Sequence, residues 1–328
     1  MVHKGNKKPL IDPKSFRKIT VCALLGEMKQ MAVCDLTFPV LRPLKPSSQL
    51  GFTPELFVKL ANVIVSEKRA YALYHNVIVL HQFLDAVAAF DKCEHPIMLS
   101  QMYHAGVVDN QFDYFQQMHS RAETFMKWNG LRTEKTIEES IGTRQGGKSA
   151  VEEFKLYNNE TVRDLELACP ETDIMAGHPA SVVALADYCA PTMTVLHKMQ
   201  ILLNIVESHG KQLHMEFGVS KCKLLITARP KKLKQVEELL SSELGILTFY
   251  GKPVSLVEES YTHIGVPQAP RQQSKLVTNY RTSKVEDITY MLNMQPRTHS
   301  KESALFPTER CIYPIFNLVS YMVWTPWP

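Results

Sequence analysis

Three stretches of the sequence decide the fold: Phe83-Leu84-Asp85 running on to Ala89-Phe90-Asp91, Gly142-Thr143-Arg144-Gln145-Gly146, and Leu185-Ala186-Asp187-Tyr188. The first and the third each place an aspartate at the end of an apolar run. The second is a glycine turn that carries an arginine and a glutamine. Short apolar runs of this kind predict buried strands, so Asp85 and Asp187 are each expected at a strand end.

Two aspartates on adjacent strand ends can hold divalent cations. Two-metal sites place their ions about 3.5–4 Å apart, and magnesium prefers hard oxygen ligands such as carboxylates. Asp85 and Asp187 are therefore candidate ligands for Mg²⁺ or Mn²⁺. The alternative for each aspartate taken alone is that it merely ends its element. The glycine block between the two aspartates favours the metal site.

The remaining pattern interleaves strands and helices without a regular βαβ rhythm, which favours an α+β fold with an antiparallel sheet. Apolar runs predict strands at 72–84, 181–186 and 223–227. Helical spacing predicts helices at 95–105, 195–209 and 233–240, closed in the first two by Gly106 and Gly210. Hairpins are expected at Asn129-Gly130 and at Gly251-Lys252.

The net charge of +4 is mild, so its distribution is more informative. Basic residues gather in three clusters, at Lys4, Lys7, Lys8, Lys14, Arg17 and Lys18, at Lys221, Lys223, Arg229, Lys231, Lys232 and Lys234, and at Arg271, Lys275, Arg281, Lys284, Arg297 and Lys301. Such clusters bind phosphate backbones through counterion release. A solvated face explains any one cluster equally well. We expect the first two clusters to share a groove with the aspartates.

The seven cysteines are scattered without a Cys-x-x-Cys pair, which is typical of a reduced intracellular compartment, nuclear or cytoplasmic. The polar, basic start has no apolar core of a secretory signal. The apolar stretch 311–328 is interrupted by prolines, so we expect a buried element and no membrane partner.

Further blocks surround the three opening stretches, in this order along the chain: Asp12-Pro13-Lys14-Ser15-Phe16-Arg17-Lys18-Ile19-Thr20, Gln49-Leu50-Gly51-Phe52-Thr53, Gly210 through Phe217 to Ser220-Lys221-Cys222-Lys223, and Tyr261-Thr262-His263-Ile264-Gly265-Val266. With these blocks, the chain resembles the reverse transcriptase domain of non-LTR (LINE-type) retrotransposons. The resemblance runs from about His3 to Pro270, and more weakly to Trp327. One block alone is common, whereas the series in order at compatible spacing is specific.

The resemblance implies RNA-directed DNA polymerase activity by two-metal nucleotidyl transfer. Asp85 and Asp187 would bind the metal ions, and Lys221 would approach the leaving pyrophosphate. The implied nucleotide-binding residues are Arg17, Phe90, Arg144, Gln145 and Gly146, with Phe90 as the gate that rejects a ribose 2′-hydroxyl. The implied template-binding residues are Gln49, Gly51 and Phe52. The implied partners are an RNA template, a DNA primer and deoxynucleoside triphosphates, with the oligomeric state left open.

The resemblance also implies a right-hand fingers–palm polymerase fold with an antiparallel palm sheet and a truncated thumb. Its parts would be 1–70 (fingers), 71–110 (palm, with the first metal aspartate), 111–141 (return to the fingers), 142–257 (palm) and 258–328 (partial thumb or connection).

The chain departs from the family pattern at the third block, where Ala-Asp-Asp is usual and Tyr188 replaces the second aspartate. Ala88 replaces a common lysine, and Ser149-Ala150-Val151 stands where Leu-Ser-Pro is usual. Weakened or absent catalysis is therefore expected. The alternative is a non-catalytic, retrotransposon-derived remnant that binds RNA. Tyr188 itself is either a lost ligand or a ring that stacks on a nucleotide.

Overall fold

A computed structural model describes residues 2–3, 9–12, 15–17, 19–21, 23–52, 58–120, 123–128, 131–144, 146–168, 182–185, 188–242, 245–258, 260–263 and 266–269 of the 328-residue chain. For residues 2, 3, 17, 58, 59, 128, 263, 266 and 267 it describes the backbone alone.

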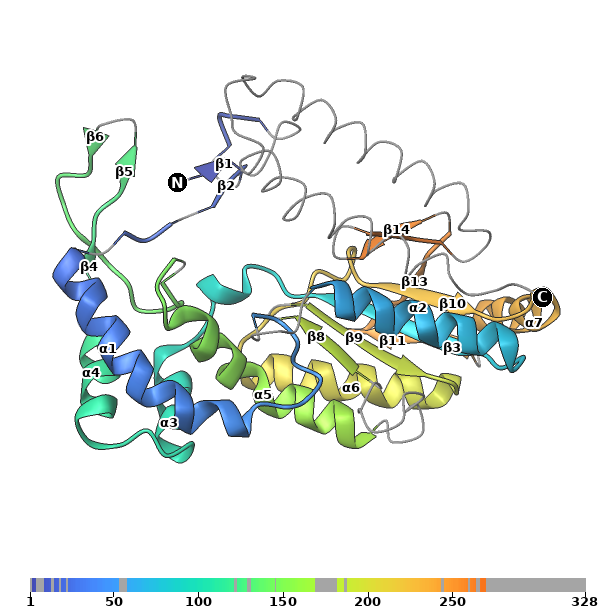
Figure 1. Cartoon of the computed structure of the whole chain (residues 1–328). Coiled ribbons are helices and arrows are strands. Elements are labelled where there is room, and N and C mark those ends of the chain that lie inside the picture. Colours follow the sequence, from blue (N-terminus) through green and yellow to red (C-terminus); the bar gives the residue numbers. More distant parts are fainter. Residues whose placement is uncertain are drawn as a thin grey trace, which may run out of the picture.

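A five-stranded sheet forms the centre of the molecule (Figure 1). Its strands lie in the order β13 (Ser255–Leu256), β10 (Lys223–Thr227), β3 (Val79–Asp85), β9 (Tyr188–Met193) and β8 (Val182–Leu185). Neighbouring strands are antiparallel except β10 and β13, which are parallel. The fold is therefore α+β as predicted, and the expectation of a wholly antiparallel sheet is wrong only at this edge.

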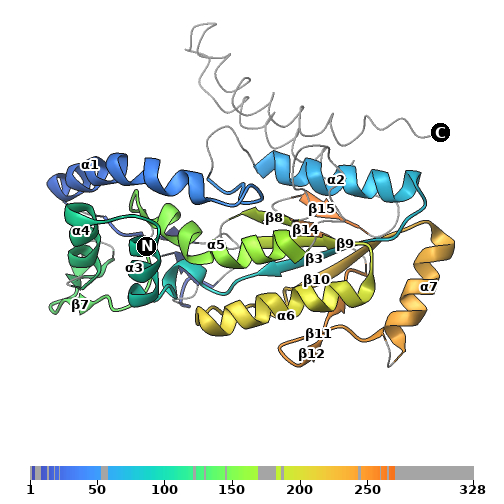
Figure 2. The ribbon, with the colours of Figure 1, turned by 90° about the horizontal axis from the view of Figure 1, so that it is seen from below.

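Helices cover both faces of the sheet. Successive residues of β3 point to opposite faces, so the strand packs against helices on both sides. Leu80 and Leu84 face α5 (Ala150–Ala168) and α6 (Leu196–Gln212), where they pack in one buried cluster with Leu165 and Leu202. Phe83 faces α2 (Val58–Tyr74), in a second cluster with Ala61 and Ile64. Figures 1 and 2 show α2 on one side of the sheet and α5 and α6 on the other.

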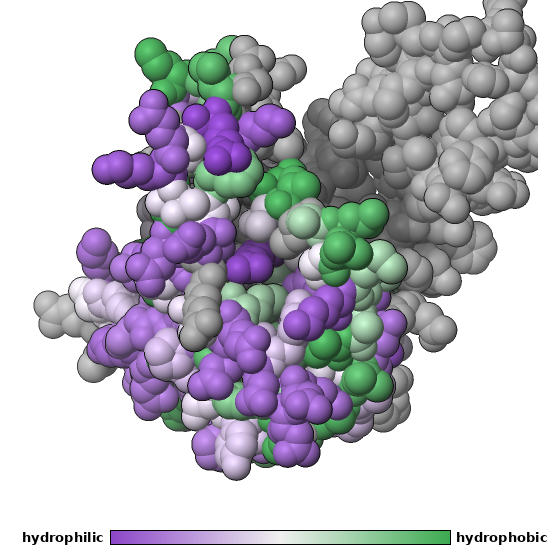
Figure 3. Space-filling view, turned by 90° about the vertical axis from the view of Figure 1, so that its left-hand side faces the viewer, coloured by the Kyte–Doolittle hydropathy of each residue, from purple (hydrophilic) through white to green (hydrophobic). Residues whose placement is uncertain are grey.

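A helical subassembly lies at one end of the sheet, built from α1 (Leu24–Leu41), α3 (His95–His104) and α4 (Asp109–Ser120) around the first half of α5 (Figure 1). Beyond it extend two small antiparallel pairs, β4 (Glu123–Thr124) with β7 (Ile137–Glu138) and β5 (Lys127–Trp128) with β6 (Leu131–Arg132). Exposed apolar side chains occur here, including Phe125, Met126 and Leu131. Figure 3 looks onto this end of the molecule and shows apolar surface at the top of the view, above a largely hydrophilic lower part.

The remaining elements are short except for one helix of 12 residues. They are β1 (Val2–His3) paired with β2 (Phe16–Arg17), η2 (Arg42–Leu44), η3 (Ala89–Asp91), α7 (Pro230–Ser241), β11 (Thr248–Phe249) paired with β12 (Lys252–Pro253), and β14 (Tyr261–His263) paired with β15 (Val266–Gln268).

The structure corrects the predicted start of the first strand. Residues 72–74 end α2, the chain turns at Asn76 with φ 54°, and β3 begins only at Val79. A continuous apolar run does not distinguish the buried face of a helix from a buried strand, so the sequence pattern merged the two elements.

Gly210 does not end its helix, since α6 continues to Gln212. A Cβ at position 210 would clash with the Tyr250 hydroxyl. Glycine at this position therefore serves close packing and not helix termination.

The second predicted hairpin is shifted by one residue. Thr248 pairs with Pro253 and Phe249 with Lys252, so the turn is Tyr250-Gly251, with φ of 49° and 70°. A two-residue turn with both central φ values positive matches the twist of the strands it joins. The other predicted hairpin is flanked as expected, because Trp128 pairs with Leu131. Asn129-Gly130 and the stretch 311–328 lie outside the described residues. Within the described part of the chain, no helix has the length and hydropathy to cross a bilayer.

Candidate functional site

Asp85 is the last residue of β3 and lies directly opposite Tyr188, the first residue of β9. Tyr188 also pairs with Leu185 at the end of β8, so β8 and β9 form a hairpin. The residues that join these two strands, Ala186 and Asp187, lie outside the described residues. The strand register thus places Asp85 beside the residue that follows Asp187 in the sequence.

Lys221 reaches the same strand end from a turn 136 residues further along the chain. The Gly218 N–H donates to the Asp85 carbonyl at 3.1 Å, and the Val87 N–H donates to the Glu216 carbonyl at 2.8 Å. These bonds fix the turn against the end of β3. The Lys221 ammonium donates to Asp85 Oδ2 at 2.9 Å. Its side chain is 64% exposed and that of Asp85 27% exposed, so the pair sits at an open edge.

Tyr188 turns its ring into an aromatic cluster. Phe83 lies two residues before Asp85 on the same face of β3, and its ring centroid is 6.3 Å from that of Tyr188. Tyr261 of β14 stacks on Phe83 with centroids 4.8 Å apart and ring planes 5° apart. Tyr188 and Tyr261 both pack against the buried cluster that contains Phe83, and burial raises the pKa of Tyr188 well above its ordinary value. The phenol is therefore neutral and packed at neutral pH.

Asp85 is the carboxylate that the described part of this site offers to a cation. Within the described residues, no group of three or more His, Cys, Asp or Glu side chains could hold a metal ion. An ammonium contacts Asp85 and a phenol occupies the position opposite it. Neither group is a ligand that magnesium prefers. A two-metal site therefore depends on Asp187 as well.

The Phe90 block and the glycine turn are joined by backbone hydrogen bonds and by the Thr143 hydroxyl, which donates to the Phe90 carbonyl at 3.4 Å. The Thr143 N–H donates to the Phe90 carbonyl and the Gly142 N–H to the Cys93 carbonyl, both at 2.7 Å. Gly142 has φ +93°, and a Cβ there would lie 3.0 Å from the Asp91 carbonyl oxygen. Glycine is required because the two segments approach so closely. The Phe90 ring stacks on Phe154 of α5 at 4.6 Å.

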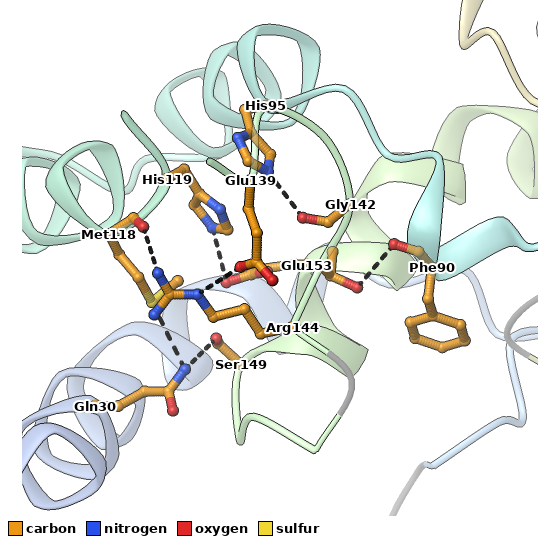
Figure 4. Close-up of polar contacts among 11 residues, drawn as sticks. Gln30, Phe90, His95, Met118, His119, Glu139, Gly142, Arg144, Ser149 and Glu153 are labelled. Carbon is orange, nitrogen blue, oxygen red and sulfur yellow. Dashed lines mark hydrogen bonds and ion pairs between the residues drawn. The ribbon is translucent and has the colours of Figure 1, made fainter. Parts of the chain in front are cut away.

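The Arg144 guanidinium points toward the helical subassembly, where it lies between Met118 and Glu139 (Figure 4). It donates to the Met118 carbonyl at 3.0 Å and lies 3.6 Å from Glu139 Oε2. Gly146 has φ +101°, and a Cβ there would lie 3.1 Å from the Thr20 carbonyl oxygen. The turn thus runs close to the segment after Arg17. Gln145 and the Arg17 side chain lie outside the described residues.

A buried polar network of side chains from α3, α4 and α5 packs beside the glycine turn (Figure 4). His95 Nε2 lies 2.8 Å from the Gly142 carbonyl oxygen, and its ring centroid is 4.5 Å from that of His119. His119 Nε2 lies 3.4 Å from Glu153 Oε1, with both side chains almost fully buried. Burial lowers the pKa of His95 below its ordinary value. No sequence signal indicates this network, because its members share no ligand-like spacing.

The predicted template-binding block lies along β8. The Leu50 N–H donates to the Ala184 carbonyl at 2.8 Å, and the Ala184 N–H donates to the Ser48 carbonyl at 2.9 Å. Gln49 is buried, and Gly51 is buried beside it. Phe52 has φ 52° and is 68% exposed. The block therefore extends the sheet edge beside the hairpin and ends in an exposed aromatic ring.

The second basic cluster is divided between the two ends of the sheet. Lys223 pairs with Phe83 near Asp85, whereas Thr227 pairs with Val79 at the other end of β3. Just before α7, Arg229 donates to the Leu73 and Tyr74 carbonyls, and in α7 itself Lys232 donates to the Asn76 carbonyl. These two side chains cap the C-terminus of α2. The expectation that the whole cluster lines one groove with the aspartates is therefore wrong.

No protein-family model matches the chain. Among solved structures it is similar to telomerase from Candida tropicalis without ligand, at 10% identity and TM-score 0.48, covering 89% of this chain and 50% of that one. It is also similar to the same telomerase in complex with a TWJ fragment of telomeric RNA, at 11% and 0.47, covering 90% and 46%. A third match is apo telomerase from Candida tropicalis truncated from its C-terminal domain, at 13% and 0.44, covering 60% and 40%. The chain spans half or less of each, and every TM-score is below 0.5. A function for this chain must therefore rest on its own residues.

Proposed function

We propose that the chain is a reverse-transcriptase-like domain of fingers and palm, whose polymerase chemistry is weakened or lost at Tyr188. One observation carries the proposal: sequence blocks far apart in the chain meet around the end of β3. Asp85 is paired with Tyr188 in the strand register, and Lys221 contacts its carboxylate. Thr143 is bonded to the Phe90 carbonyl, 53 residues away.

In this proposal, Asp85 and Asp187 would hold Mg²⁺ or Mn²⁺, which would supply positive charge for an in-line displacement at phosphorus. The position of Asp85 at an open strand end fits this role, and the phenol opposite it does not. Lys221 would neutralise charge on the leaving pyrophosphate.

The remaining residues would position the nucleic acids. The Phe90 ring, held by Phe154, would select the sugar, and Gln145, Gly146 and Arg17 would meet the incoming deoxynucleoside triphosphate. Arg144 would act indirectly, since its contacts with Met118 and Glu139 fix the turn. Gln49, Gly51 and the exposed Phe52 would lie along an RNA template paired with a DNA primer. The fingers would comprise 1–70 and 111–141, the palm 71–110 and 142–257, and a partial thumb or connection 258–328.

A second candidate is a non-catalytic remnant that binds RNA. Two observations favour it. The Lys221 ammonium is paired with the Asp85 carboxylate at 2.9 Å, and the Tyr188 ring is packed against the aromatic cluster of Phe83 and Tyr261. Both contacts stabilise the present arrangement of side chains around Asp85.

Extension of a DNA primer on an RNA template, measured in Mg²⁺ and in Mn²⁺, distinguishes the two candidates. Slow extension that disappears in Asp85→Asn supports the polymerase. Binding of the RNA–DNA hybrid without any extension, unchanged in Asp85→Asn, supports the remnant. Failure to bind the hybrid at low salt contradicts both.

A further inference from the structure

The C-terminal end of α2 presents three aromatic side chains to solvent. Tyr71 is 38% exposed and Tyr74 is 74% exposed, and His75, directly after the helix, is exposed as well. The His75 ring contacts both tyrosines, with its centroid 4.1 Å from that of Tyr71 and 4.9 Å from that of Tyr74. The rings therefore hold one another in place, which lowers the entropic cost of binding a further ring against them.

Basic side chains at the start of α7 lie against the same helix end. Arg229 donates from Nε to the Leu73 carbonyl at 2.9 Å and from Nη2 to the Tyr74 carbonyl at 3.3 Å. These bonds bring the start of α7 beside the three rings, and Figures 1 and 2 show both elements at one end of the molecule. Lys231 and Lys234 follow on α7, and both are exposed.

The charge beside the rings is mainly positive. The acidic residues of α7, Glu237 and Glu238, come about one turn after Lys234, and on α2 Glu67 lies one turn before Tyr71. Aromatic rings next to basic side chains are the combination that binds an unpaired strand, whose bases stack on the rings while its phosphates meet lysine and arginine. A duplex keeps its base faces stacked inside, so it offers this surface phosphates alone.

We propose that this region, the α2–α7 surface, binds an unpaired nucleic-acid strand. The α2–α7 surface consists of the rings of Tyr71, Tyr74 and His75 and the basic side chains of Arg229, Lys231 and Lys234. It is separate from the candidate polymerase site, because β3 begins near it at Val79 and ends at Asp85, about 20 Å away for a strand of this length. The proposal does not rest on polymerase chemistry, and a fully paired RNA–DNA hybrid would not occupy this surface.

Binding of single strands to the full chain tests the rings. The probes are fluorescent oligouridine RNA and oligothymidine DNA of about 12 nucleotides, and the tighter of the two identifies the strand. Tyr74→Ala should weaken its binding at least about fivefold, because one stacked base loses its ring. Tyr74→Phe keeps the ring and should bind like the wild type. Tyr103→Ala, at an exposed tyrosine of α3, is the matched control and should change nothing.

The charges are tested by the salt dependence of the same binding. Lys231→Ala combined with Lys234→Ala should lower the slope of log affinity against log salt by about 1.4, since each phosphate contact on a single strand contributes about 0.7. Lys252→Ala, at an exposed lysine of β12, is the control and should keep the wild-type slope. A saturating, fully paired RNA–DNA hybrid should not displace the oligonucleotide.

Equal affinities of Tyr74→Ala and Tyr74→Phe would overturn the proposal, and so would displacement of the oligonucleotide by the hybrid. A loss confined to the lysine variant would show a surface that attracts any acidic polymer, including an acidic protein, and would also overturn it. A hybrid that does not bind the chain at all would contradict the proposed function and leave the results with single strands unaffected.

Discussion

At the scale of single residues, two side chains determine the surroundings of the Asp85 carboxylate. Lys221 neutralises its carboxylate at 2.9 Å, and Tyr188 occupies the paired position on β9. The sequence predicted Asp85 and Lys221 as site residues and Tyr188 as the departure from the pattern, and the structure brings the three residues together. The sequence could not reveal that Tyr188 and Tyr261 pack against one buried cluster around Phe83, because that arrangement depends on strand register and on a hairpin outside the sheet.

Gly142 carries a prediction of its own at this scale. Gly142→Ala should destabilise the protein by about 1–3 kcal/mol, since alanine resists a positive φ and its Cβ would lie 3.0 Å from the Asp91 carbonyl oxygen. Gly251→Ala is the matched control, with φ +70° and no atom within 4 Å of the added Cβ. Urea unfolding should show a larger loss at position 142. Equal losses would mean that the contact with Asp91 contributes nothing.

At the scale of elements, the sequence predicted the strand that ends at Asp85, the helix that begins at His95 and the hairpin across 129–130. It failed where a distant contact decides an element. Gly210 was expected to end a helix, whereas Tyr250, from a segment beyond β10 and α7, packs against it. The strand start at Val79 was missed because the apolar run from 72 serves two elements with different periods.

Two glycines in helices should respond oppositely to alanine. Gly210→Ala should be destabilising, because its Cβ would meet the Tyr250 hydroxyl and the Met215 carbonyl oxygen, the latter at 2.9 Å. Gly26→Ala in α1 meets nothing within 4 Å and should stabilise by about 0.5–1 kcal/mol, the usual helical gain over glycine. Thermal unfolding of both variants checks this. A stabilising Gly210→Ala would contradict the packing role.

The network of α3, α4 and α5 predicts a pH dependence. Burial, which outweighs the bond to the Gly142 carbonyl, lowers the pKa of His95 below its ordinary value of 6.5. The facing charged groups are His119 on α4 and Glu153 on α5. The unfolded chain therefore binds more protons at His95 than the folded one, so this contribution to stability is complete above about pH 6.5 and is lost as the pH falls below it.

Replacing His95→Gln should flatten the loss of stability between about pH 7.5 and 5.5, measured as the free energy of unfolding in urea. His104→Gln, at an exposed position on α3, should leave the wild-type slope. A His95→Gln protein that loses as much stability on acidification as the wild type would show that another group controls this pH range.

At the scale of the whole molecule, the sheet separates two basic regions that the sequence grouped together. Lys221 lies at the Asp85 end of β3, and α7 follows the opposite end of β10. An RNA–DNA hybrid bound at the proposed site would therefore contact Lys221 and not α7. Lys221 and α7 are near each other in the sequence but lie on different surfaces, whereas Asp85 and Lys221 are 136 residues apart and meet.

Salt dependence of hybrid binding tests this division. Each phosphate contact contributes about 0.7–0.9 to the slope of log affinity against log salt, so Lys221→Ala should reduce the slope by about that amount. Lys231→Ala, on the exposed face of α7, should leave the slope and the affinity unchanged. A slope that falls with Lys231→Ala but not with Lys221→Ala would show that the hybrid binds near α7, and it would contradict the proposed site.

The central claim is that the chain is a polymerase palm weakened at Tyr188, and primer extension by Tyr188→Asp tests it most directly. The assay is run in Mn²⁺ at a temperature where the variant is folded and binds the RNA–DNA hybrid. Restoring the carboxylate should raise the extension rate at least about tenfold, which is about 1.4 kcal/mol of barrier, and adding Asp85→Asn should abolish the gain. A folded Tyr188→Asp protein that binds hybrid and Mn²⁺ yet extends no faster than the wild type would contradict the claim.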